Sequence, residues 1–156
     1  MAISKAALIE MVDKTLADHE KAVDENKTAT EEWNRKRREK WDVEAVPKIR
    51  QLRDMFTAKL KAGQVITDDD VTNVLGRDRH GWGRNVSEVT WSPNATPSYR
   101  EVKTVPHIDV SQLRQLKSAL SIIEGDSITP SALAQWGFRN LGWLFKAADQ
   151  LTKEGK

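Results

Sequence analysis

Apolar residues recur every three or four positions in the first part of the chain, the spacing that places them on one face of a helix or coiled coil. This face, the N-terminal seam, holds Ile9, Val12, Leu16 and Val23. The first proline is Pro47, and no glycine precedes it. We therefore predict a helical arm over residues 1–46 whose seam contacts a protein partner or a second copy of the chain.

Two arrangements of this arm fit the sequence. A single helix from Ser4 to about Asp42 would be roughly 58 Å long, because each residue adds 1.5 Å. Thr28 and Glu31 have the spacing of a capping box, so a hairpin of two helices that turns near residues 25–28 is the alternative. A single helix of that length would project from a domain of this size or pair with another chain.

Pro47 predicts the start of a second helix. Proline disfavours helical angles at the preceding Val46 and is tolerated in the first turn of a helix. Gly63 supplies a left-handed cap at the other end. One face of this helix carries Ile49, Leu52, Phe56 and Leu60.

The segment between Gly63 and Gly76 predicts a short extended piece and then a helix of two turns. Thr67 has the place of the N-cap. Three aspartates at positions 68–70 follow it in the first turn, where the helix dipole favours negative charge.

Residues 89–105 alternate their side chains around a loop that contains Pro93 and Pro97. This pattern predicts two strands joined by an extended hairpin loop. Val89 and Trp91 would share a face of the first strand, and Tyr99 would lie on the second.

The C-terminal third is predicted to be helical again. Asp109 or Ser111 caps a helix that ends at Gly125 and carries a seam of Leu113, Leu116, Leu120 and Ile123. Thr129 and Pro130 begin another helix, which holds the densest apolar cluster of the chain and is bent or closely approached at its glycines. The two helices pack together, and Trp136 and Trp143 are candidates for a protein interface because tryptophan is enriched there.

These elements predict a mainly α fold with a small central α+β segment. The arm covers residues 1–46, the central segment 47–108 has one β-hairpin, and residues 109–156 form a C-terminal helical pair. The last two parts form one compact unit, since 156 residues support one domain, or one small domain with a helical arm.

The order of elements from Pro47 to Val105 is helix, short strand, capped helix, basic segment and hairpin. Together with the sequence ITDDDVTNVLG at residues 66–76, it resembles the winged helix-turn-helix modules of small phage or bacterial DNA-binding proteins. The resemblance implies DNA contacts from the segment after Gly76 and phosphate contacts from the wing. The residues implied are Arg79, His80, Arg84 and Asn85 in that segment, and Arg100 and Lys103 on the wing.

Positive charge is concentrated in one part of the chain. The net charge is only +2, but residues 31–61 hold ten basic and six acidic side chains. Five cations lie between Trp33 and Trp41, among them Arg35, Lys36 and Arg38, which are candidates for phosphate contact. Because these cations point in nearly all directions around a helix, a solvated helical stretch is the alternative.

Sequence signals for catalysis or metal binding are weak. The chain has no cysteine, so cysteine-ligated zinc and thiol catalysis are excluded. Its three histidines form no H-E-x-x-H pair, no G-x-S-x-G elbow is present, and Trp82 stands where a P-loop would need lysine. We expect no enzymatic activity, no metal and no cofactor.

No apolar run approaches the ~20 residues of a membrane span, and acidic residues occur too early for a signal peptide. We expect a protein of the cytoplasm, or of a virion if the chain is phage-encoded. The leading hypothesis is a non-enzymatic helical interaction protein that contacts nucleic acid through the central segment and the basic helix. The alternative is a phage-type assembly or accessory protein, or an inhibitor, that makes protein contacts only.

Overall fold

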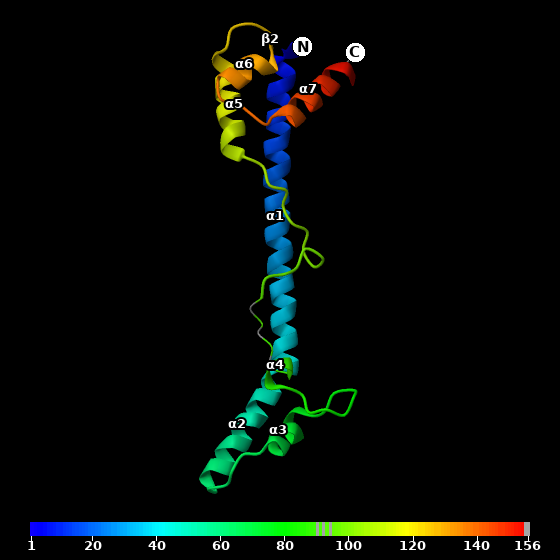
Figure 1. Ribbon diagram of the computed structural model, residues 1–156, viewed down its shortest axis with the longest axis vertical. Helices are drawn as coiled ribbons and strands as arrows, with labels where there is room; N and C mark the ends of the chain where they lie inside the picture. The colour runs from blue at the N-terminus through cyan, green and yellow to red at the C-terminus, as the bar shows by residue number, and fades with distance from the viewer. Residues whose placement is uncertain (90, 92, 94, 155–156) are drawn as a thin grey trace. The chain divides into compact units, whose positions relative to one another are not determined.

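The computed structural model describes residues 1–89, 91, 93 and 95–154 and is mainly helical (Figure 1). Two strands of two residues each, Ile3–Ser4 (β1) and Ser127–Ile128 (β2), form a small antiparallel sheet. The helices are Lys5–Glu44 (α1), Val46–Lys61 (α2), Asp68–Leu75 (α3), Val86–Val89 (α4), Val110–Ile122 (α5), Pro130–Gln135 (α6) and Gly142–Glu154 (α7).

The chain forms two compact units, which divide it differently from the predicted boundaries at residues 46 and 108. The terminal unit combines Met1–Asn26 with Thr104–Lys156, and the central unit is Lys27–Lys103. Helix α1 contributes its first part to the terminal unit and its second part to the central unit. The C-terminal third therefore shares a compact unit with the start of the chain, because both segments carry apolar faces that need cover.

Helix α1 is continuous from Lys5 to Glu44, so the prediction of a single helix is confirmed and the hairpin alternative is wrong. Thr28 and Glu31 lie inside this helix, where their spacing has no capping role. A hairpin would have needed a turn, and the sequence offers no glycine or proline there to favour one over continued helix.

The first turns of the N-terminal seam are covered by the chain's own helices. Val12 is fully buried in a core that it shares with Leu113 and Leu116 of α5 and Leu144 of α7. Ile9 and Leu16 pack partly buried against the same core, and Val23 is exposed. Val12 is thus a core residue and not the interface residue that the spacing predicted, because its partners come from residues about a hundred positions away.

The small sheet closes the terminal unit and was not predicted. Ile3 pairs with Ile128 and Ser4 with Ser127. The backbone N–H of Lys5 donates to the carbonyl of Asp126 at 2.9 Å, and its Nζ donates to the carbonyl of Ile123 at 2.6 Å. Strands of two residues lie below the length at which alternation of side chains can be recognised in a sequence.

The predicted C-terminal caps are confirmed, but the last helix is divided. Asp109 caps α5 and Thr129 caps α6, each through a side-chain oxygen that accepts a backbone N–H. The single helix expected after Pro130 ends at Gln135, because Gly137 adopts φ +91° and Asn140 φ +61°, angles outside a right-handed helix. Helix α7 then starts at Gly142.

The α1–α2 boundary is a break of one residue. Ala45 separates the helices, and its N–H still donates to the carbonyl of Trp41. Val46 is the first residue of α2, so the prediction that Pro47 would force Val46 out of the helix is wrong. Pro47 occupies the first turn, where its missing N–H removes no hydrogen bond. At the other end, Gly63 has the predicted left-handed φ of +65°.

The predicted hairpin is absent from the part of residues 89–105 that the structure describes. Residues 86–89 form α4, and residues 99–102 form a turn. Both are stabilised locally: the Glu88 carboxylate accepts the Asn85 N–H at 3.2 Å, and the Glu101 carboxylate accepts the Ser98 N–H at 2.8 Å. Such side-chain bonds compete with strand pairing for the backbone. Residues 90, 92 and 94 of the expected hairpin lie outside the described residues.

Helix α3 has the cap that the sequence predicts. The Thr67 hydroxyl accepts the Asp70 N–H at 3.3 Å, and the Asp70 carboxylate accepts the Thr67 N–H at 2.9 Å. These bonds satisfy two backbone donors at the helix start. The Thr67 N–H lowers the pKa of Asp70, and Lys59, at 3.2 Å, lowers it further.

Removing this cap is expected to destabilise the central unit. Thr67→Ala should lower the free energy of unfolding by about 1 kcal/mol, the usual effect of losing a threonine N-cap. Thr28→Ala is the matched control, because Thr28 has the same capping-box spacing but lies exposed inside α1. It should change stability by less than about 0.5 kcal/mol. Urea unfolding followed by circular dichroism measures both, and equal losses would contradict the assignment of the cap.

Candidate nucleic-acid interface

Residues 76–84, the Trp82 loop, form a closed and internally bonded turn after α3. Arg77 and Gly83 form an antiparallel bridge. The Asp78 N–H donates to the Trp82 carbonyl at 2.8 Å, and the Arg84 N–H donates to the Gly76 carbonyl at 3.1 Å. These bonds join the two sides of the loop, so its backbone is held in one conformation.

The Asp78 side chain fixes the tip of the loop. Its Oδ1 accepts the N–H of His80 at 2.8 Å and that of Trp82 at 3.0 Å. Gly81, between them, has φ +83°, which favours glycine. A Cβ at Gly83 would lie 2.7 Å from the Thr72 hydroxyl, so the loop packs closely against α3. The Asp78 carboxylate thus accepts two backbone N–H groups of its own loop.

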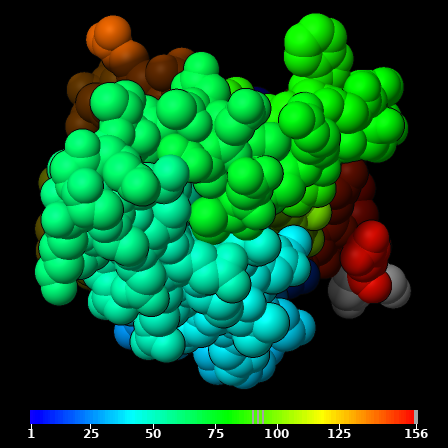
Figure 2. Space-filling view, turned by 90° about the horizontal axis from the view of Figure 1, so that it is seen from below, coloured from blue at the N-terminus to red at the C-terminus, as the bar shows by residue number. Residues whose placement is uncertain are grey.

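Trp82 is presented to solvent by this loop. Its side chain is 74% exposed, although tryptophan is usually well buried. Arg77, Arg79 and Arg84 belong to the same loop and are exposed, against one acidic residue, Asp78. Figure 2 shows the green segment that contains this loop standing out at the edge of the face viewed. The loop therefore combines a flat aromatic surface with a local excess of positive charge.

The side chains around Trp82 are partly ordered by neighbours. Arg77 Nη1 donates to the Gly81 carbonyl at 2.9 Å, and Arg79 Nε donates to His80 Nε2 at 3.1 Å. Both arginines retain further N–H donors, since a guanidinium carries five. These donors remain able to contact a phosphate.

The structure brings three predicted residues together on a loop. Arg79, His80 and Arg84 were expected to contact DNA from the segment after Gly76, and this segment forms the Trp82 loop. Asn85 precedes α4, and both its N–H and its side-chain amide donate to the Glu88 carboxylate. Sequence reasoning missed Trp82 and Arg77 as site residues, although the run RDRHGWGR at positions 77–84 contains the signal.

The basic part of α1 is largely neutralised by its own helix. Arg35 pairs with Glu32 and Glu39, Lys36 lies 3.5 Å from Glu32, and Arg38 lies 3.9 Å from Asp42. The hydrogen bond from Arg35 is the main reason that the pKa of Glu32 falls to about 2, so this carboxylate keeps its charge at a lower pH than an ordinary glutamate does. This pairing favours the alternative prediction of a solvated helix over phosphate contact at these three cations.

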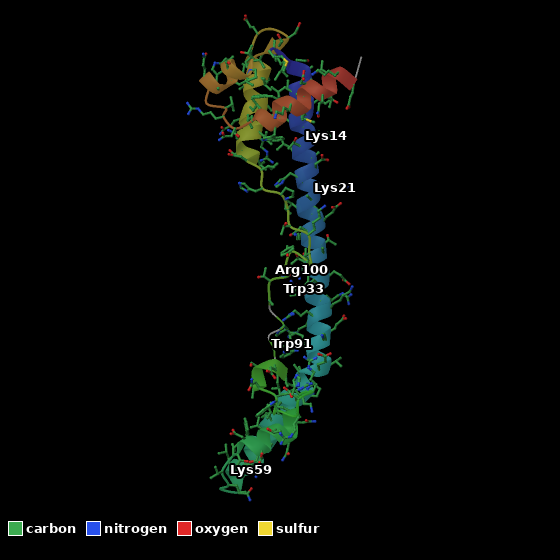
Figure 3. All side chains as sticks on the ribbon, turned by 45° about the vertical axis from the view of Figure 1, so that its right-hand side comes forward. Lys14, Lys21, Trp33, Lys59, Trp91 and Arg100 are labelled. Atoms are coloured by element: carbon green, nitrogen blue, oxygen red, sulfur yellow. The ribbon has the colours of Figure 1, made fainter. Side chains whose placement is uncertain are left out.

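Arg37 serves packing inside the central unit. Its guanidinium lies over the ring of Trp33 at 5.1 Å and over that of Trp91 at 4.6 Å. Figure 3 labels the two tryptophans. A cation between two aromatic rings is attracted to both. Hydrogen bonding from Ser98 is the main cause of the lowered pKa of Glu101, with smaller effects of Trp33 and Arg37. These contacts fasten the segment around Trp91 to α1.

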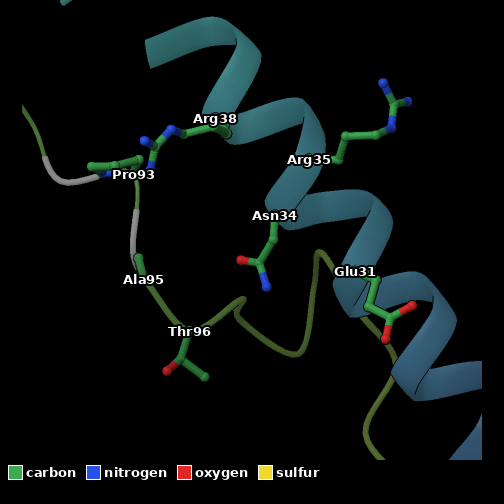
Figure 4. A pocket seen from close by; sticks show the side chains of 7 residues that line it. All are labelled: Glu31, Asn34, Arg35, Arg38, Pro93, Ala95 and Thr96. Carbon is green, nitrogen blue, oxygen red and sulfur yellow. The ribbon is translucent and has the colours of Figure 1, made fainter. Parts of the chain in front are cut away.

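A polar cavity of about 650 Å³ lies beside this stack. Figure 4 shows Asn34 turned toward the segment that carries Thr96, whereas the Arg35 guanidinium points to the other side of α1. The cavity is lined by Glu31, Asn34, Arg35, Arg38, Pro93, Ala95 and Thr96. Because Arg35 and Arg38 are paired with acids of α1, the cavity offers little uncompensated charge to a ligand.

The two predicted wing residues lie at a turn and not on a strand. Arg100 Nε donates to the Tyr99 hydroxyl at 3.2 Å, and its guanidinium lies 5.7 Å from the Tyr99 ring. Tyr99 is exposed. Lys103 is exposed and has a partner of its own. The predicted wing was to present Arg100 and Lys103 from a strand. The described part of residues 89–105 contains no such strand.

Within residues 1–89, 91, 93 and 95–154, no three His, Cys, Asp or Glu side chains gather closely enough to hold a metal ion. None of the helices described there combines the length and the apolar character that crossing a membrane requires.

Comparison with models of protein families, with curated proteins and with solved structures gives no match to this chain.

Proposed function

We propose that this protein binds single-stranded nucleic acid through the Trp82 loop. The observation that carries the proposal is the 74% exposed side chain of Trp82 on a loop that also presents Arg77, Arg79 and Arg84. Bases stack on aromatic side chains, and arginines attract the phosphates that flank a base. Stacking tolerates every base, so we expect little sequence preference.

The rigidity of the loop supports this proposal. The bridge between Arg77 and Gly83 and the two bonds to Asp78 Oδ1 hold the loop before any ligand arrives. A loop that is already ordered loses little conformational entropy on binding. Trp82 is itself a suitable anchor, because its large ring has only two side-chain torsions.

A single strand suits this geometry better than a duplex. Reading the major groove requires a helix or a two-stranded ribbon that enters it. In the described part of residues 77–105 the only helix is α4, with four residues. An unpaired base, by contrast, exposes its face to one aromatic side chain. The resemblance to winged helix-turn-helix modules stays a prediction, and duplex binding is the outcome that would favour it.

Fluorescence anisotropy with a labelled oligothymidylate of about 16 nucleotides tests the proposal. Wild-type protein should bind at about 50 mM salt and more weakly at about 200 mM. Trp82→Ala should weaken binding roughly tenfold to a hundredfold, as expected when one stacked base is lost. Arg79→Ala should also reduce the salt slope by about 0.7, the contribution of one phosphate contact in a single strand.

Trp143→Ala is the matched control, since the side chain of Trp143 is 47% exposed but belongs to the terminal unit. It should leave the affinity unchanged. Absence of binding at low salt, or equal affinity of wild type and Trp82→Ala, would overturn the proposal. Tighter binding of a duplex of the same length would replace it with groove binding.

A further inference from the structure

One face of α2 forms an open apolar groove in the central unit. The groove encloses about 520 Å³ and is lined by Ile49, Leu52, Arg53, Phe56, Thr57, Leu60 and Val86. Leu52 is buried at its inner edge, whereas the side chain of Leu60 is 70% exposed. Ile49 and Val86 are exposed as well.

The sequence predicts this face as a buried one, yet only Leu52 is fully covered. Apolar residues at helical spacing normally face a core. Here α2 packs on α3 on one side, where Lys48 Nζ donates to the Val74 carbonyl and Lys59 pairs with Asp70. The groove lies on the neighbouring face of α2, where Ile49 and Leu60 are exposed to solvent. Contiguous exposed apolar surface of this kind marks a binding site for a protein or a membrane.

One side of the groove is basic: Arg53 lines it, and Arg50 and Lys61 lie on the same side of α2. Arg50, Arg53, Thr57 and Lys61 follow a spacing of three or four residues and so lie along one side of α2. Arg53 pairs with Asp54, the only acidic residue of α2. Within the described residues, Arg50 and Lys61 form no salt bridge. A ligand that covers the apolar residues of the groove would place the residues beside its own apolar face next to these cations.

We propose that this groove binds an amphipathic helix of another protein, one whose apolar face is flanked by carboxylates. Helices bind apolar grooves through anchors at the same three- and four-residue spacing that α2 shows. Carboxylates beside Arg50, Arg53 and Lys61 add attraction on the basic side. This site is separate from the Trp82 loop, and its test does not depend on nucleic-acid binding.

A second copy of the chain fits this groove poorly. In a two-fold contact the same surface meets itself. Helix α2 carries Lys48, Arg50, Arg53, Lys59 and Lys61 against Asp54 alone, so pairing of α2 with another α2 would bring like charges together.

An anionic membrane surface also fits this groove poorly, although basic amphipathic helices often bind such surfaces. Val86 of α4 lines the site together with residues of α2. The apolar residues therefore line a groove between two elements, which accepts a helix more readily than a flat lipid surface does.

Anisotropy of a labelled synthetic peptide tests the proposal with the full chain. The peptide has 16 residues, the length of α2, with leucines at helical spacing and glutamates on the flanks. A second peptide carries lysine in place of every glutamate. We expect the acidic peptide to bind at least about tenfold more tightly than the basic one, since like charges on the basic side of the groove oppose the latter.

Three substitutions test the groove against the rest of the surface. Leu60→Glu should lower the affinity for the acidic peptide by at least about tenfold, because it places a charge in the apolar contact. Val65→Glu is its control: Val65 is 81% exposed and lies outside the groove, so binding should not change. Arg53→Glu should lower affinity for the acidic peptide and raise it for the basic one. Circular dichroism verifies that each variant is folded.

Several results would overturn the proposal. They are failure of the acidic peptide to bind, equal binding of the two peptides, and binding that Leu60→Glu leaves intact. A dimer that sedimentation detects in the wild type and that Leu60→Glu abolishes would also overturn it. That result would assign the groove to a second copy of the chain. Binding to phosphatidylserine vesicles that Leu60→Glu abolishes would assign it to a membrane.

Discussion

Replacing Val12 by aspartate is expected to unfold the terminal unit. Val12 is fully buried against α5 and α7, so the substitution would place a carboxylate in an apolar core with no partner. Burial of an unpaired charge is among the most destabilising single changes. We expect the free energy of unfolding to fall by more than about 4 kcal/mol, a large part of the roughly 5–15 kcal/mol that a domain has.

Hydrogen exchange with mass spectrometry measures this effect unit by unit. Amides of residues 5–26 and 110–154 should lose protection in Val12→Asp, whereas those of α2 and α3 should keep it. Val23→Asp is the control, because Val23 continues the same seam but is exposed. It should leave exchange nearly unchanged. Intact protection in Val12→Asp, with a change only in sedimentation, would mean that another chain covers the seam.

Leu116→Ala is expected to cause the second-largest loss of stability. The Leu116 side chain is fully buried in the middle of α5, where it contacts the core that also contains Leu8 and Leu133. Truncation removes apolar contacts and leaves a cavity that rigid neighbours fill only in part. The expected loss is about 2–5 kcal/mol in the free energy of unfolding.

Ile122→Ala provides the comparison for this change. Ile122 is on the same helix and is 82% exposed, so its truncation should change stability by less than about 0.5 kcal/mol. Urea unfolding followed by the fluorescence of Trp136 and Trp143, with the four other tryptophans replaced by phenylalanine, reports on the terminal unit. A loss below about 1 kcal/mol for Leu116→Ala would contradict the assignment of Leu116 to the centre of the core.

Much of the local structure could be predicted from the residues. The N-caps at Thr67, Asp109 and Thr129 and the left-handed Gly63 lie where the sequence placed them. Each depends on groups within a few positions, which a sequence displays directly. The pairing of Arg35 with Glu32 and Glu39 is equally local, because these residues lie three and four positions apart on one helix.

The prediction of a hairpin was wrong because of local hydrogen bonds, which the alternation of side chains does not reveal. Side chains alternate through residues 89–105, but the carboxylates of Glu88 and Glu101 bond to nearby backbone N–H groups. Those bonds favour a short helix and a turn. The candidate site was likewise only partly predictable. Its arginines could be read from the sequence, but the hydrogen bonds that close the Trp82 loop and expose its tryptophan could not.

By itself the sequence determined that the first 46 residues are mainly helical, that helices begin after Thr67 and Thr129, and that cysteine chemistry is absent. Only the tertiary structure decided that Val12 meets α5 and α7, that the α2 groove is left open, and that Trp82 stands exposed on a closed loop. The difference has a physical reason. Caps and helix continuity depend on neighbouring residues, whereas burial depends on which apolar faces meet, and a pattern of apolar positions does not name its partner.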